Sequence, residues 1–193
     1  MKYAIDGATW PDRAFWRSFR LRLWIGLAVT FGVLGLWLAM MPEATRDAIL
    51  AYWSRVELKT PAPTLRPLWS TPLSVQLHVA AAVAGIVTGA LIFLLPKGTG
   101  FHRLLGWSWV GAMTVVAVTS VVMIFDLSTG INAFHIFTAM TVLSLWGGLA
   151  GIRRGNVKQH AASMAGLYVG GLLIAGLFAF MPGRTMWQVL FGG

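Results

Sequence analysis

Long apolar blocks separated by short polar segments make up most of the chain. A transmembrane helix needs roughly 20 mainly apolar residues to cross a hydrocarbon core of about 30 Å. Blocks that meet this requirement lie near 23–41, 73–95, 101–125, 133–152 and 161–180. Their interiors lack Lys, Arg, Asp and Glu, apart from Arg103 at the start of the third block. The pattern predicts an all-α integral membrane protein with five transmembrane helices.

The connections between these blocks differ in length. The loop between the first and second spans is long, and it ends in a Pro-rich stretch, 60–72, for which we expect an extended crossing without regular structure. The remaining turns are short, which forces neighbouring helices to run antiparallel. We therefore expect spans two to five to form an up-down four-helix bundle, with the first span appended. The predicted parts are 1–72 and the bundle with its tail, 73–193.

Two segments outside the spans mix aromatic and charged residues. Residues 11–22 place Phe and Trp among four Arg, as an amphipathic helix on a membrane surface does. Residues 43–58 place apolar and aromatic residues among charges, and we expect them to lie on the outer surface. The lipid bilayer is thus the first predicted partner.

Composition agrees with the membrane interpretation. Hydrophobic residues make up 57% of the chain and charged residues 11%, against about a quarter charged in soluble domains. The chain has no Cys, which excludes disulfides, thiolate-held iron–sulfur clusters and covalently attached haem. A net charge of +9 would suggest nucleic-acid binding in a soluble protein. Here the basic residues flank apolar blocks, so we expect contact with lipid headgroups and no nucleic acid.

The distribution of basic residues predicts the orientation. With five spans, ten Lys and Arg lie on the side of the N-terminus and five on the other side. The positive-inside rule then places the N-terminus in the cytoplasm and the C-terminus outside a bacterial inner membrane.

Small and hydroxyl residues lie inside the predicted bundle. Gly-x-x-x-Gly pairs begin at Gly85, Gly147 and Gly166, and close helix packing explains them best. The alternative is that they leave room for a flat cofactor. The polar residues within the spans are expected to bond across helices or to their own backbone; they are Thr119, Ser120, Thr138 and Thr141.

Each bundle helix carries one histidine near its start, and the chain has no other. They are His78, His102, His135 and His160. Because consecutive helices alternate direction, His78 and His135 fall on the outer side, and His102 and His160 on the cytoplasmic side. Each pair belongs to diagonal helices of the bundle, which is the geometry that bis-imidazole ligation of a b-type haem needs.

Helix chemistry favours this interpretation of the histidines. The positive end of a helix dipole disfavours imidazolium and keeps the ring neutral, as a metal ligand must be. Gly85 and Gly106 lie on the helix faces of His78 and His102, where a porphyrin would need space. The competing interpretation of each histidine is a headgroup contact or a helix cap.

Several short motifs resemble a family of small bacterial predicted membrane proteins of unknown function. The most specific are a His-Arg-x-x-Gly turn that starts at His102 and a Pro-Gly-Arg…Phe-Gly ending that starts at Pro182. The resemblance covers about 73–193. In arrangement alone, the histidines also resemble those of di-haem transmembrane cytochromes b. That resemblance implies an outer haem on His78 and His135 and an inner haem on His102 and His160.

These features lead to two hypotheses of function. The first is a transmembrane electron carrier with one or two b haems. The alternative is a non-catalytic structural or assembly subunit of a larger respiratory or photosynthetic membrane complex, so another membrane protein is an expected partner. No hydrolytic or group-transfer motif is present, which leaves electron transfer as the one enzymatic role in view.

Overall fold

The computed structural model describes residues 42–54, 63–126 and 135–191, with isolated residues between 17 and 40. The predicted first span, 23–41, and the predicted amphipathic segment, 11–22, lie almost wholly outside these residues. Within the described part every regular element is a helix. The predicted all-α class is therefore confirmed for this part of the chain.

The helix α2, Glu43–Ser54, belongs to a compact unit that covers 9–61. Its Glu43 and Arg46 form an exposed ion pair at 3.8 Å, one helical turn apart. Leu50 is also largely exposed. A helix is thus present where the sequence predicts an interfacial segment, and its place on a membrane surface stays a prediction.

Helices long and apolar enough to cross a membrane number four in the described residues: Leu73–Leu94, Gly100–Met123, Ile136–Arg153 and Val157–Ala179. The first three correspond to α4 (Leu73–Leu94), α5 (Gly100–Asp126) and α6 (His135–Arg153). The fourth is a continuous helix made of α7 (Val157–Gly166), a π-helical segment η1 (Leu167–Ile174) and α8 (Ala175–Ala179). These match predicted spans two to five. The predicted count of five is not confirmed.

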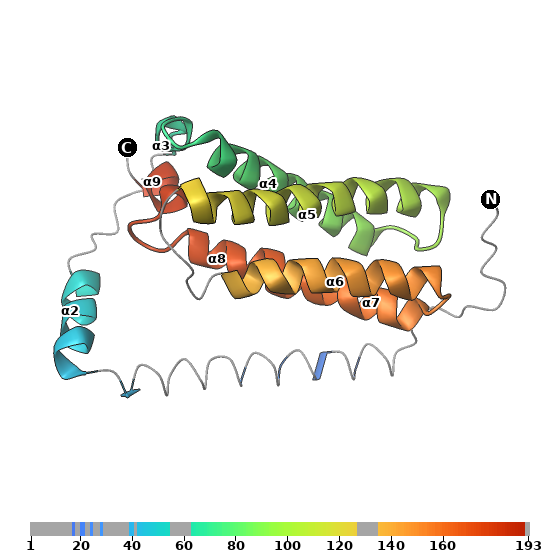
Figure 1. The fold of residues 1–193 in the computed structure, drawn as a ribbon, viewed down its shortest axis with the longest axis horizontal. Coiled ribbons are helices and arrows are strands. Elements are labelled where there is room, and N and C mark those ends of the chain that lie inside the picture. The colour runs from blue at the N-terminus through green and yellow to red at the C-terminus, as the bar shows by residue number, and fades with distance from the viewer. Residues whose placement is uncertain are drawn as a thin grey trace. The chain divides into compact units, whose positions relative to one another are not determined.

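The four helices run in alternating directions (Figure 1). Gly98 and Gly155 adopt φ of 78° and 73° in the α4–α5 and α6–α7 turns, a left-handed conformation that glycine adopts without steric cost. Helix α4 packs against α5, α5 against α6, α6 against α7 and η1, and η1 against α4. The four spans therefore form an up-down bundle, in which α4 faces α6 diagonally and α5 faces the α7–α8 helix.

The bundle has a narrow core. Met113 of α5 and Leu167 of η1 are fully buried at its centre. Large apolar side chains such as Val87, Leu143 and Leu177 instead point outward and are exposed. In water this surface would be unfavourable, whereas the apolar tails of lipids solvate it. The helices also satisfy their own backbone hydrogen bonds, as a bilayer requires.

Glycines allow the helices of the bundle to approach closely. A Cβ on Gly89 of α4 would collide with the Tyr168 ring, and one on Gly151 would come within 3.0 Å of the His160 backbone nitrogen. Gly85 and Gly170 likewise face side chains of neighbouring helices. Close packing, the interpretation preferred for the glycine pairs, is thus confirmed at these four positions.

Two short helices lie at the end of the bundle where α4 begins (Figure 1). They are α3 (Arg66–Trp69) and α9 (Thr185–Phe191), and the Thr64 N–H donates to the Val189 carbonyl at 2.8 Å. The prediction of an irregular 60–72 segment is therefore wrong for α3. Proline suits the first turn of a helix, where its missing N–H has no intrahelical partner.

Candidate functional site

The histidines lie at the two ends of the bundle. We call the end where α4 and α6 begin the His78 end, and the end where α5 and α7 begin the His160 end. His78 lies in the second turn of α4, and His135 begins α6 at the same end. The side chain of His135 lies outside the described residues. His102 and His160 lie in the first turns of α5 and α7, at the opposite end.

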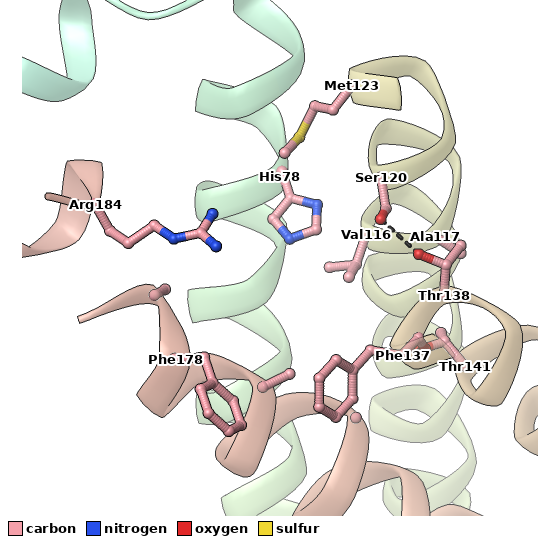
Figure 2. A pocket seen from close by; sticks show the side chains of 13 residues that line it. His78, Val116, Ala117, Ser120, Met123, Phe137, Thr138, Thr141, Phe178 and Arg184 are labelled. Atoms are coloured by element: carbon pink, nitrogen blue, oxygen red, sulfur yellow. Dashed lines mark hydrogen bonds between the residues drawn. The ribbon is translucent and has the colours of Figure 1, made fainter. Parts of the chain in front are cut away.

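A cavity of about 180 Å³ opens at the His78 end. All four spans and the segment before α9 contribute to its lining (Figure 2). Its apolar wall contains Phe137 of α6 and Phe178 of α8, whose ring centroids are 6.1 Å apart. On the α7–α8 helix the lining residues Gly171, Ala175 and Ala179 follow one another at intervals of four. These small side chains along one helix face leave the space.

His78 enters this cavity in a defined orientation. Its ring Nδ1 lies 3.0 Å from Thr119 Oγ1 on α5. The Thr119 hydroxyl donates its single proton to the Val115 carbonyl at 2.6 Å. The same oxygen lies 3.1 Å from the Val116 carbonyl oxygen, so the hydroxyl links the His78 ring to the backbone of α5.

Hydroxyl groups fill most of the remaining polar lining. Ser120 of α5 and Thr138 of α6 form a hydrogen bond of 2.6 Å across the two helices (Figure 2). Thr141 donates to the Phe137 carbonyl of its own helix at 2.8 Å. The expected bonding of these residues, across helices or to their own backbone, is confirmed.

Arg184 also lines the cavity, and the sequence did not single it out for a site. The chain leaves α8 through a turn in which Gly183 adopts φ of 85°. That turn brings Arg184 back over the end of the bundle, with its guanidinium directed toward the His78 ring (Figure 2). The one sequence signal was the Pro-Gly-Arg order, since Pro and Gly end a helix and reverse the chain.

At the His160 end, α6 and α7 are joined by side-chain bonds to backbone carbonyls. His160 Nδ1 lies 3.0 Å from the Gly148 carbonyl oxygen. A carbonyl can only accept, so Nδ1 carries the hydrogen and Nε2 the lone pair. Gln159 Nε2 donates to the neighbouring Gly147 carbonyl at 3.0 Å. Helix α7 itself is capped by the Asn156 side chain, which accepts from the Gln159 N–H at 2.9 Å.

His102 and His160 lie at the same end of the bundle. They come from α5 and α7, which are diagonal in the bundle. The structure thus places both members of this predicted pair at one end of the bundle. Lys97 lies in the turn between α4 and α5, at the same end.

The glycines predicted to make room for a cofactor have different surroundings. A Cβ built on Gly106, one turn after His102, would meet nothing within 4 Å. A Cβ on Gly85 would lie 3.3 Å from Leu172 and 3.4 Å from the Met113 sulfur. Open space therefore lies beside Gly106, whereas the space beside Gly85 is taken by two core side chains.

The described residues contain no cluster of three or more His, Cys, Asp or Glu that could hold a bare metal ion.

Comparison with known proteins places the bundle in a family. No curated protein and no solved structure matches the chain. A family model described as "Predicted membrane protein (DUF2306)" matches residues 75–187, which extend from the start of α4 into α9. The match covers more than half of the chain and agrees with the resemblance seen in the sequence. The protein therefore belongs to the DUF2306 family of predicted membrane proteins.

Proposed function

We propose that the protein is a transmembrane electron carrier that binds a b-type haem between His102 and His160. The observation that carries the proposal is that His102 and His160 lie in the first turns of diagonal helices, at the same end of the bundle. A bis-imidazole haem needs two such rings on opposite sides of a slot. Haem iron supplies the one-electron chemistry, and the protein supplies the ligands and an apolar surrounding.

The hydrogen bond of His160 suits a ligating role. Metal-binding histidines almost always donate their second ring N–H to a carbonyl or carboxylate, which fixes the tautomer and the ring orientation. His160 donates from Nδ1 to the Gly148 carbonyl and so presents Nε2 as the ligating atom. His102 is followed one turn later by Gly106, beside which the space is open.

The His78 end fits a haem less well. Its cavity of about 180 Å³ is smaller than the roughly 300–1,000 Å³ pockets that hold drug-sized ligands, and a porphyrin is larger than most such ligands. Leu172 and Met113 occupy the space beside Gly85. The outer haem between His78 and His135 stays a prediction from the sequence, and the proposed stoichiometry is one haem per chain.

We further propose that the His160 end faces the cytoplasm of a bacterial inner membrane. Among the described residues of the bundle unit, five basic residues flank the His160 end and two flank the His78 end. The five are Lys97, Arg103, Arg153, Arg154 and Lys158, and the two are Arg66 and Arg184. The positive-inside rule supports this orientation.

An absorption spectrum of the purified full chain, expressed with haem precursors and recorded oxidised and reduced, tests the proposal. We expect a Soret band that His102→Ala and His160→Ala each abolish. Gln159→Ala is the matched control, because it removes a similar bond between α7 and an α6 carbonyl without removing an imidazole. The control variant should keep its haem.

A spectrum without a Soret band would overturn the haem proposal. In that case, co-purification with a larger membrane complex, together with unchanged stability after replacement of all four histidines, would favour the structural or assembly subunit. The broad, exposed apolar faces of the bundle provide the surface that such a subunit needs.

A further inference from the structure

One face of α6 changes from apolar to basic where the helix reaches the His160 end. Leu143 and Trp146 are exposed on this face, at 69% and 72%. Arg153 and Arg154 follow at the end of the helix, and both are exposed. They lie seven and eight residues beyond Trp146, which is about 10–12 Å along the axis of an α-helix. The face therefore carries apolar surface, an indole and two guanidinium groups in the order in which a phospholipid carries its chains, its ester region and its phosphate.

A small side chain, Ala150, leaves space between the indole and the guanidinium groups. Ala150 lies one turn after Trp146 and one turn before Arg154. Together with Leu149 and Arg153, these three residues line a hollow of about 290 Å³. A headgroup can therefore enter beside the helix instead of lying over a flat surface.

The charge around this hollow is positive, and the acid of the bundle is far from it. Lys158, in the first turn of α7, is exposed like the two arginines. Residues 62–193 contain one acid, Asp126, which ends α5 at the opposite end of the bundle. Guanidinium groups bind phosphate oxygens through paired, charge-assisted hydrogen bonds. An anionic headgroup therefore complements this surface, whereas a zwitterionic headgroup also brings a cationic ammonium group to it.

From these features we propose that the end of α6 binds one anionic phospholipid. Arg153 and Arg154 hold its phosphate, and Trp146 contacts its ester region, the depth at which tryptophan rings gather in membranes. The acyl chains follow the exposed apolar face of α6. The proposal requires neither the haem nor the orientation proposed above, because it concerns only which lipid lies at this end of the bundle.

Lipid discrimination is the first test. The full chain in detergent is titrated with phosphatidylglycerol, and native mass spectrometry counts the lipids bound to each molecule. We expect one lipid that binds at least about fivefold more tightly than phosphatidylcholine does. Inorganic phosphate at millimolar concentration should not displace it. Equal binding of the two lipids would overturn the choice of an anionic headgroup, and displacement by phosphate would show a phosphate site instead of a lipid site.

Matched charge variants locate the site. The double variant Arg153→Gln, Arg154→Gln should weaken phosphatidylglycerol binding at least about tenfold. The control double variant Lys97→Gln, Arg103→Gln removes the same charge from the same end of the bundle, at the α4–α5 turn. It should change the binding by less than about twofold, because salt screens distant charges. Equal losses in the two double variants would show that the attraction is diffuse and would overturn the site.

The role of the hollow is tested with Ala150→Leu, which keeps every charge and fills the space. We expect it to weaken phosphatidylglycerol binding, and unchanged binding would overturn the proposal. Thermal melts followed by circular dichroism establish that each variant is folded. If the arginine double variant does not fold, Ala150→Leu and the two lipids decide the question alone. The same titration on protein produced without haem keeps this result separate from the fate of the haem proposal.

Discussion

The ring nitrogen Nδ1 of His78 lies 3.0 Å from the hydroxyl oxygen of Thr119, which joins α4 to α5 beside the cavity. The Thr119 hydroxyl also lies 2.6 Å from the Val115 carbonyl oxygen and 3.1 Å from the Val116 carbonyl oxygen of its own helix. A single threonine thus connects the His78 ring to the backbone of α5.

Thr119→Val should destabilise the bundle and release the His78 ring, since it removes the hydroxyl that is hydrogen-bonded to Nδ1. Side-chain hydrogen bonds between membrane helices contribute about 0.6 kcal/mol on average and up to about 1.7 kcal/mol. We expect a loss in this range in the free energy of unfolding, measured by denaturant titration in detergent. Thr119→Ser keeps the hydroxyl and should lose less. An unchanged free energy of unfolding in Thr119→Val would show that the hydrogen bond does not contribute.

The positions of the four bundle helices could be predicted from the sequence. Apolar length located them, Pro96 marked the end of α4, and short turns required antiparallel neighbours. In a bilayer these signals are strong, because each span must satisfy its own backbone hydrogen bonds. The end of the bundle was harder to predict, since α3 and α9 are held by a contact between residues far apart in sequence, Thr64 and Val189.

The candidate site could be predicted only in part. The grouping of the four histidines into two ends could be predicted, because each lies near the start of its helix and consecutive helices run antiparallel. Arg184 reaches the cavity because α8 ends and the chain turns at Gly183. Neither feature leaves a periodic pattern in the sequence. The π-helical turns of η1 were likewise not predicted, since their residues are as apolar as those of an α-helical span.

Gly89→Ala should destabilise the contact of α4 with η1. The added methyl group would collide with the Tyr168 ring, which is held in place by its hydroxyl bond to the Ile86 carbonyl at 3.2 Å. Overpacking of this kind costs about 1–3 kcal/mol. Gly111→Ala, where a Cβ meets nothing within 4 Å, is the control and should be neutral or stabilising by up to about 1 kcal/mol. Thermal unfolding in detergent measures both, and equal melting temperatures would contradict the packing role of Gly89.

The hydrogen bond between Ser120 and Thr138 should couple α5 to α6 at the cavity. We expect Ser120→Ala and Thr138→Val to be non-additive in a double-mutant cycle, because each removes the same 2.6 Å bond. The coupling energy should be about 0.6 kcal/mol and at most about 1.7 kcal/mol. Free energies of unfolding of the four proteins in the cycle give the value. Strict additivity would mean that the two hydroxyls contribute separately.

The proposed haem predicts a distinctive outcome for His102→Met. Methionine can replace an axial histidine, and Met/His ligation raises the reduction potential of a haem relative to His/His ligation. His102→Met should therefore retain haem with a higher midpoint potential, whereas His102→Ala loses it. A redox titration followed in the visible bands measures the shift. An unchanged midpoint potential in His102→Met would show that another residue is the axial ligand of the haem.

The orientation of the bundle can be tested with single cysteines, because the natural chain has none. Ser70→Cys lies at the His78 end and Lys158→Cys at the His160 end, and both positions are exposed. If the His160 end faces the cytoplasm, a membrane-impermeant maleimide should label Ser70→Cys in intact spheroplasts and Lys158→Cys only after permeabilisation. The positive-inside rule predicts this order because five basic residues flank the His160 end and two flank the other. The reverse order of labelling would show that the bundle has the opposite orientation, with the His78 cavity on the cytoplasmic side.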